Sequence, residues 1–304
     1  MRPEVLLHED QPGHPRGRPQ AERGRRRHGG NGRQVPRKRR RDPGPGDAGG
    51  IGLGPVSERI EIEAGGSYDG LDLSDYDFAE RDLADIKLTN CVLTDAQLSA
   101  VILQGARFVE CRFLRCRFAH ADLREAVFIR CNFADPDSHS GVQVAFSQLD
   151  QARFEACDLS FADIERTSAW SAGFTETNLR GARFHRVDFA RALSRNTVHT
   201  AAVFQRCNLE LCDLSDAGLR GCDLSGSSLR EADLTDADLE GADLSGCDLF
   251  QAVTGGAKLA GADLRGAQVS GLDLLALGSR DGMKVTLSQQ QDLLSALGLD
   301  IHAD

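Results

Sequence analysis

Large apolar residues recur at every fifth position from Leu73 to Leu274, and a small residue stands two places before nearly every one of them. We call the large residue the centre. The centres of a first run, from Leu73 to Phe133, are all Leu or Phe. A second run resumes one residue out of phase at Val144, and 23 of its 27 centres are Leu, Phe, Ile or Val. A period of five fits neither a helix nor a continuous strand.

Residues two apart lie on the same side of an extended chain, so the small residue and the centre face inward together. Because five is odd, a continuous strand would turn this pair to the opposite face at each repeat, and the chain must therefore bend between repeats. Gly often follows two places after the centre in the second run, as expected where a turn requires positive φ. Four short strands and four turns close a square coil, and stacked coils form a solenoid.

The repeats Ala232-Asp233-Leu234-Thr235-Asp236 and Ala242-Asp243-Leu244-Ser245-Gly246 resemble those of the pentapeptide repeat family. The resemblance implies an all-β fold, a right-handed quadrilateral β-helix. We place this pentapeptide repeat solenoid at residues 57–280.

Residues 1–56 form a different segment, because residues 1–50 hold 13 Lys and Arg against 6 acids and eight of the nine prolines lie at or before Pro55. This Pro/Gly/Arg-rich composition predicts a disordered tail. The tail is interpreted as an arm for nucleic acid or an anionic surface, as a solvated extension, or as a stretch translated only from a start codon placed too far upstream.

The chemistry-bearing residues suggest no active site. All nine cysteines occupy the small inward slot, where a buried thiol is sufficient explanation, and the histidines are scattered without a nucleophilic partner. We therefore expect that the protein is not an enzyme and has no catalytic residue, cofactor or metal ion. No apolar stretch approaches the ~20 residues needed to span a bilayer, so we expect a cytoplasmic protein without a membrane partner.

Two interruptions of the period predict loops, at residues 134–143 and 192–202. The first carries the phase slip and Pro136, and in the second the centres become Ser194 and His199. The second is expected to leave the coil as a projection, with a locally irregular coil as the alternative. The candidate partner-binding residues of the two loops are Asp135, Asp137, Ser138, His139, Ser194, Arg195, Asn196, Thr197, Val198 and His199.

Residues 281–304 leave the period and predict a small C-terminal helical cap, with a helix over 286–298. Ser288 with Gln291 forms a capping-box pattern, and Gly298 is a natural stop. The cap either covers the open end of a monomer or also packs against a second copy as a two-fold homodimer. The candidate dimerisation residues are Leu287, Leu293, Leu294, Leu297 and Leu299.

Within the repeat family, the chain resembles the Qnr-type quinolone-resistance proteins, which protect DNA gyrase and topoisomerase IV. The similar residues are Asp135, Ser138 and Gly141 in the first loop, Leu179 to Ala182 before the second loop, and Gln291, Leu293, Leu294, Leu297 and Gly298 in the cap. The resemblance implies two loops at these places, dimerisation through the cap, and a type II topoisomerase as partner.

Charge is unevenly distributed along the solenoid, with 13 acids against 4 basic residues from Cys207 to Leu275 and 6 Arg against 3 acids from Gln104 to Cys131. Asp223, Asp243 and Asp263 recur at every fourth repeat and should stack as a column of carboxylates. We therefore expect a DNA mimic that binds the topoisomerase, without direct DNA binding by the repeats. The alternatives are a non-catalytic scaffold for protein–protein interaction with no topoisomerase role, and a protein that binds DNA through its basic arm.

Overall fold

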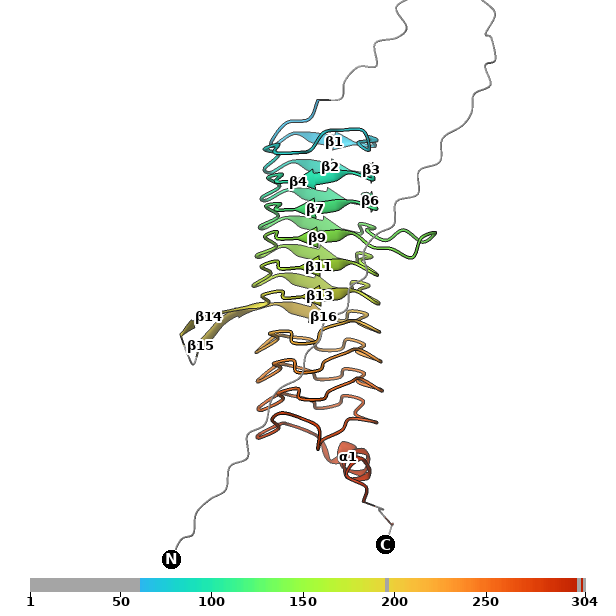
Figure 1. Ribbon diagram of the computed structural model, residues 1–304, viewed down its shortest axis with the longest axis vertical. Helices are drawn as coiled ribbons and strands as arrows, with labels where there is room; N and C mark the ends of the chain where they lie inside the picture. The colour runs from blue at the N-terminus through green and yellow to red at the C-terminus, as the bar shows by residue number, and fades with distance from the viewer. Residues whose placement is uncertain (1–60, 195–196, 300–301, 303–304) are drawn as a thin grey trace, which may run out of the picture. The chain divides into compact units, whose positions relative to one another are not determined.

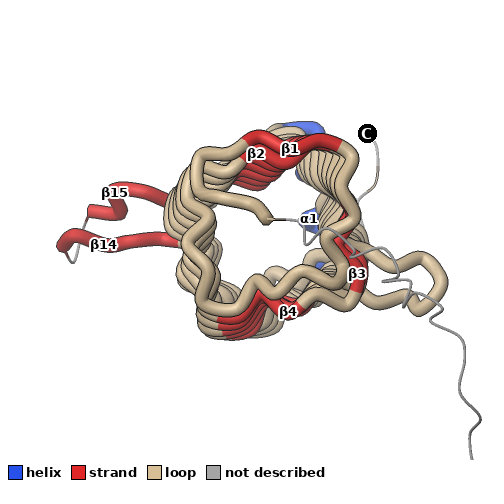
Figure 2. The backbone as a smooth tube through the Cα atoms, turned by 90° about the horizontal axis from the view of Figure 1, so that it is seen from above, coloured by secondary structure: helices blue, strands red, loops and turns tan. Residues whose placement is uncertain are grey.

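The computed structural model describes residues 61–194, 197–299 and 302. From residue 61 onward the chain winds into stacked coils with four faces, the right-handed quadrilateral β-helix expected from the repeat (Figures 1 and 2). Along one face, Leu88 pairs with Tyr68 on one side and with Phe108 on the other. Each of these partners is four repeats away, so one coil consists of four repeats. Residues 1–56, the predicted tail, lie outside the described residues.

Parallel sheets build the faces. The longest has seven strands: β1 (Ser67–Asp69), β2 (Lys87–Thr89), β5 (Arg107–Val109), β8 (Val127–Ile129), β10 (Arg153–Glu155), β12 (Gly173–Thr175) and β16 (Val203–Gln205). A second sheet holds β4 (Gln97–Ser99), β7 (Arg117–Ala119), β9 (Gln143–Ala145), β11 (Asp163–Glu165) and β13 (Arg183–His185). Strands β3 (Val92–Thr94) and β6 (Arg112–Leu114) pair separately. Beyond residue 205 the same pairing between successive coils continues as single bridges to Lys284, a little past the predicted end of the coil.

The core is the inside of the tube, where the centres and small residues are buried as predicted. From β5 to β16 the centres of the seven-stranded sheet form a column of parallel phenylalanine rings. Phe128 stacks on Phe154 at 4.8 Å between ring centroids, and Phe154 stacks on Phe174 at 5.0 Å, with interplanar angles of 4° and 3°. Each stacked pair adds about 0.5–1.5 kcal/mol beyond area burial.

The corners have positive φ, as the glycines of the second run predicted. Gly241 and Gly246 have φ of 68° and 66°. Residues with side chains occupy the same corner position elsewhere, such as Glu110 with φ 55° and Arg130 with φ 50°. Their backbone N–H groups donate to the next rung, Glu110 to Ile129 and Arg130 to Glu155, so the stacked coil compensates for the local strain.

Two insertions account for the breaks in the period. Across the first loop, Phe128 pairs with Phe154, whereas an uninterrupted coil would pair it with position 148. The insertion is thus longer than one repeat by a single residue, which explains the phase slip. Across the second, Phe174 pairs with Phe204, whereas an uninterrupted coil would reach position 194. This insertion has the length of two whole repeats, so the phase is unchanged although the inserted residues leave the coil.

The C-terminal cap consists of a 3₁₀ turn, η1 (Leu287–Gln289), followed by α1 (Gln290–Ala296), and Gly298 with φ 76° ends the helix as predicted. The predicted capping box at Ser288 and Gln291 is wrong. The helical segment begins earlier, so Thr286 and Gln289 form the box, and the Thr286 N–H donates to Gln289 Oε1 at 2.7 Å. Gln289 is buried and its Nε2 donates to the carbonyls of Leu264 and Ala267, so it closes the last coil.

Candidate partner-binding surfaces

The predicted acidic column is present. Asp223, Asp243 and Asp263 occupy equivalent positions on successive rungs, since Asp223 bridges to Asp243 and Asp243 to Asp263. Neighbouring rungs of a sheet lie ~4.8 Å apart, so these carboxylates have a fixed spacing. Asp213 and Asp233 stack in the same way on another face. The C-terminal coils therefore present rigid rows of carboxylates on more than one side.

Each of these aspartates also has a structural role. Oδ1 of Asp243 accepts the backbone N–H of Ser245 at 2.9 Å, and Oδ1 of Asp223 accepts that of Ser225 at 2.9 Å. Asn178 and Asn208 make the same bond with an amide oxygen. The bond spans the buried centre and satisfies an N–H at the bend. Surface Asp is therefore favoured in this repeat whether or not its charge is used.

The negative charge of the column is partly compensated at its C-terminal end. Arg265 binds both carboxylate oxygens of Asp263, with Nη2 to Oδ2 at 2.7 Å, and this lowers the pKa of Asp263 to about 2. Lys284 Nζ approaches the same carboxylate at 3.8 Å. Burial opposes ionisation of Asp223, but hydrogen bonds from Ser225 and Gln205 outweigh it and lower the pKa. Within the described chain, no basic group lies within ion-pair distance of Asp243.

The first loop projects from one corner and is held at its base by Asp135. Asp135 is buried, and its Oδ2 accepts Arg115 Nη1 at 2.8 Å and Ser138 Oγ at 2.9 Å. Asp135 therefore supports the loop and is not itself available to a partner. Asp137, Ser138 and His139 are exposed, as a contact surface requires. Gly141 runs against the backbone of Phe161 and Ala162, where an added Cβ would clash.

The second interruption is an antiparallel hairpin, β14 (Ala190–Ser194) and β15 (Thr197–Ala201), which confirms the predicted projection. It leaves the tube on the side away from the first loop (Figure 2). Ser194, Thr197, Val198 and His199 lie on its strands, outside the coil. Arg195 and Asn196 lie outside the described residues. Ser194 and His199 are thus not core centres, although the unchanged phase of the repeat suggested this.

The cap has one buried and several exposed leucines. Leu293 is 8% exposed and belongs to the core of its own chain, so together with Gln289 it closes the end of the tube. Leu294 is half-buried, while Leu287, Leu297 and Leu299 are 90%, 38% and 53% exposed. Sequence reasoning missed two further exposed apolar side chains near this end, Leu275 and Val285.

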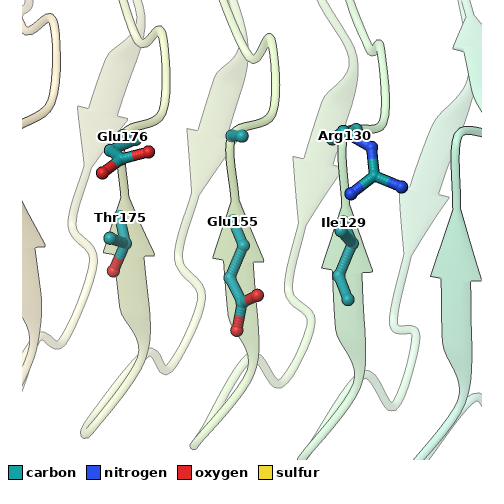
Figure 3. A pocket seen from close by; sticks show the side chains of 6 residues that line it. Ile129, Arg130, Glu155, Thr175 and Glu176 are labelled. Carbon is teal, nitrogen blue, oxygen red and sulfur yellow. The ribbon is translucent and has the colours of Figure 1, made fainter.

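A shallow pocket of about 300 Å³ lies on another corner, with Arg130 and Glu176 on either side of it (Figure 3). Ala156, at the same corner position of the repeat, interrupts a ladder of charged side chains there. On one side Arg130 pairs with Glu110 at 2.7 Å, and on the other Arg206 pairs with Glu176 at 3.0 Å. Arg130, Glu155 and Glu176 line the pocket with both signs of charge. The pocket is wide and open to solvent.

The described residues hold no group of three or more His, Cys, Asp or Glu side chains arranged to bind a metal ion. The nine cysteines are all free and buried. Burial raises the pKa of the Cys222 and Cys247 thiols to about 12. None of the helices in the described segments has the length and apolar character needed to cross a membrane.

The family model for pentapeptide repeats matches eight copies, at residues 72–113, 111–137, 147–193, 200–230, 212–251 and 242–274. The chain belongs to the pentapeptide repeat family. Its repeats carry the inward pair and the stacked aspartates described above, while the two projections and the cap are its departures from a plain repeat array.

Solved structures of QnrB1, a plasmid-mediated fluoroquinolone resistance protein, are similar to this chain. The full-length form is 23% identical and has a TM-score of 0.54, and the match covers 77% of this chain and 100% of QnrB1. A trypsin-treated variant is 24% identical with a TM-score of 0.57 and coverage of 78% and 97%. Identity at this level establishes a shared fold. No curated protein matches the chain.

Sequence reasoning missed Arg115, the residue that holds the first loop. It sits at a corner, in an ordinary polar position of the repeat. A signal was available, however, because Asp95, Arg115 and Asp135 are each separated by four repeats and therefore occupy successive corners of one column.

Proposed function

We propose that this protein is a non-catalytic, cytoplasmic DNA mimic that binds a type II topoisomerase, DNA gyrase or topoisomerase IV, and protects it from quinolones or other topoisomerase poisons. The observation that carries the proposal is the fixed row of carboxylates on the C-terminal coils. Asp223 and Asp243 stand one rung apart on a rigid tube, and duplex DNA likewise presents regularly spaced negative charges, one per ~1.7 Å of axis.

The two projections supply the enzyme contacts in this proposal. Asp137, Ser138 and His139 are exposed on the first loop, which is fixed to the coil by Asp135 and Arg115. The second loop contributes the hairpin of β14 and β15. Contacts on rigid supports require little ordering on binding. The likeness to QnrB1, a fluoroquinolone resistance protein, supports this use of the fold.

The proposed functional unit is a homodimer formed through the cap. Leu287, Leu297 and Leu299 supply the apolar surface, together with Leu275 and Val285, and Leu294 at its margin. Two-fold pairing there joins the acidic halves at the centre of the dimer and directs the more basic ends outward. Leu293 stabilises each cap from within.

A second candidate function is a scaffold without a topoisomerase role. The observation in its favour is the hydrogen bond that Asp223 and Asp243 each accept from the backbone N–H two residues later. This bond stabilises the bend and would by itself explain why aspartate stands there. The two functions differ in whether the charge is needed. Asn keeps the bond and removes the charge, as Asn178 and Asn208 illustrate.

A supercoiling assay with purified gyrase and ciprofloxacin tests the proposal. Wild-type protein should restore supercoiling in the presence of the drug, or should inhibit gyrase at higher concentration. The double variant Asp223→Asn/Asp243→Asn should fold normally and lose most of this effect. Glu61→Gln/Glu63→Gln, which removes the same charge at the other end of the coil, is the matched control. No effect of the wild type at micromolar concentration would reject the proposal and leave the scaffold, and equal effects of both variants would show that the charge of the carboxylate row is not needed.

A further inference from the structure

The outward side chains on one column of the seven-stranded face change sign along the tube. They begin with cations, pass through neutral residues and end with carboxylates. In ladder order they are Lys87, Arg107, Val127, Arg153, Gly173, Val203, Asp223, Asp243 and Asp263.

The cations of this column are available to a partner. Lys87, Arg107 and Arg153 are exposed, and within the described chain none of them takes part in an ion pair. Other arginines of these coils are engaged, for example Arg115 with Asp95 and Arg130 with Glu110. Asp243, at the other end of the column, likewise has no basic neighbour within ion-pair distance in the described segments.

We propose that this face pairs with the same face of a second copy, side by side and antiparallel. A row that is positive at one end and negative at the other is complementary to itself after a two-fold rotation, and such a contact is closed. With Gly173 on the axis, Arg107 lies opposite Asp243 of the second copy, and Lys87 opposite Asp263. Because Arg265 and Lys284 already compensate Asp263, the contact between Arg107 and Asp243 supplies most of the attraction. A shift by one rung in one direction would place Lys87 opposite Lys284, which the charges disfavour. A shift in the other direction would pair Arg107 with Asp223 and Lys87 with Asp243, and it differs from the proposed register in removing Gly173 from the axis.

The rest of the face tolerates this contact. The second outward column of the same strands is mostly neutral. In the proposed register it places no like charges opposite each other. Its residues are Thr89, Val109, Ile129, Glu155, Thr175, Gln205, Ser225, Ser245 and Arg265. The first loop and the hairpin of β14 and β15 leave from other sides of the tube and do not cover β1 and β2 (Figure 2). Gly173 at the centre carries no side chain to hold the two sheets apart.

The size of the face predicts weak association. Eight rung steps from Lys87 to Asp263 span ~38 Å, and a strip ~10 Å wide gives ~400 Å² per copy, or ~800 Å² in total. Stable interfaces bury ~1,200–2,000 Å². The pairing is therefore reversible and is weakened by salt, which screens exposed charges. Since it covers Asp243, it would also compete with topoisomerase binding, a consequence that rests on the proposed function.

Sedimentation velocity at about 0.02 M and about 0.5 M salt tests the pairing, using full-length chains that carry Leu287→Asp and Leu299→Asp to prevent cap association. At protein concentrations up to about 100 µM, dimer should form at low salt and dissociate at high salt. Adding Arg107→Asp or Asp243→Lys should each weaken dimerisation at least ~10-fold, because like charges then face each other. Lys is compatible with this position of the repeat, as Lys87 and Lys258 show.

Mixing the two variants decides the register. In a mixed dimer each altered side chain faces an opposite charge, so association should return toward the wild-type level. The control pair Arg186→Asp and Glu231→Lys makes the same charge changes on other sides of the tube and should have no effect, alone or mixed. Absence of a low-salt dimer, insensitivity to Arg107→Asp, or failure of the mixture to recover would each overturn the proposal. The experiment measures only association of the chain with itself and not supercoiling, so its outcome is independent of the proposed function.

Discussion

Arg115 and Asp135 are joined across two neighbouring coils by an ion pair of 2.8 Å, at the point where the chain leaves the tube to form the first loop. The same guanidinium also binds Asp95 at 2.7 Å on the preceding coil. The loop is therefore anchored by a column of alternating charges, and Asp135 orients it further by accepting a hydrogen bond from Ser138.

Replacing Arg115 by Ala should loosen this loop while the tube remains folded. Asp135 would be left buried without its cation, an unfavourable state for a carboxylate. Hydrogen exchange should rise by at least ~10-fold in the peptide covering residues 134–143 and change little elsewhere. Arg130→Ala, which removes the exposed Glu110 pair and touches no loop, is the control. Unchanged protection of the loop in Arg115→Ala would show that the anchor lies elsewhere.

The same contact predicts a pH dependence. Hydrogen bonds from Arg115 and Ser138 lower the pKa of Asp135 to about 2, below the ~3.9 of an unfolded Asp. A lowered pKa contributes stability that is complete above the unfolded value and is lost as the pH falls through the folded value. The difference in unfolding free energy between the wild type and Asp135→Asn should thus be constant near neutral pH and shrink from about pH 4 to about pH 2. Denaturant titrations at several pH values measure it, and a pH-independent difference would contradict the assignment.

Substitutions of Asp243 can separate the contribution of its hydrogen bond at the bend from that of its charge. Asp243→Ala removes the acceptor for the Ser245 N–H and should lower the unfolding free energy by ~0.5–1.5 kcal/mol. Asp243→Asn keeps an acceptor and should change it by less than ~0.5 kcal/mol. Thermal and denaturant unfolding of the two variants provide the comparison. Equal destabilisation by Ala and Asn would mean that the charge, and not the hydrogen bond, stabilises the corner.

The cysteines should be unreactive in the folded protein. Their side chains line the inside of the tube, and burial raises the pKa of the Cys116 and Cys207 thiols to about 11. The thiolate is the reactive form, so labelling by a disulfide reagent at pH 8 should be slow and should follow the rate of unfolding. Full reaction in denaturant is the positive control. Rapid labelling of one or two thiols in native protein would identify coils that open locally.

The coil could be predicted well from the sequence because the pattern of residues within one repeat determines which side chains face inward and where the chain bends. Leu234 and Ala232 face inward for the same reason as every other pair, so the fold follows from one repeat and its period. The hairpin was harder to predict, since an insertion of two whole repeats preserves the phase and made Ser194 and His199 resemble poorly filled centres. The roles of Arg115 and Gln289 depend on contacts with residues at least four repeats away in the chain, Asp135 for Arg115 and Leu264 for Gln289, which no single repeat contains.

The exposure of the candidate partner-binding residues was predicted with less success, because the repeat pattern does not determine which side chains are exposed where the period is broken. Asp135 and Leu293 were both expected to face a partner, yet both side chains are buried in their own chain. Each lies where an irregular segment joins the coil, and there the surroundings of a side chain depend on how the chain enters and leaves. Asp137, His139 and Leu287 are exposed, and their role in binding stays a prediction.

The most direct test of DNA mimicry is competition between this protein and a labelled linear duplex for purified gyrase, followed by fluorescence anisotropy at low ionic strength. Wild-type protein should displace the duplex in a salt-sensitive manner, and Asp223→Asn/Asp243→Asn should do so at least ~10-fold less well. If gyrase binds the protein and the duplex together, or if the neutral variant competes as well as the wild type, the carboxylate row does not act as a substitute for DNA.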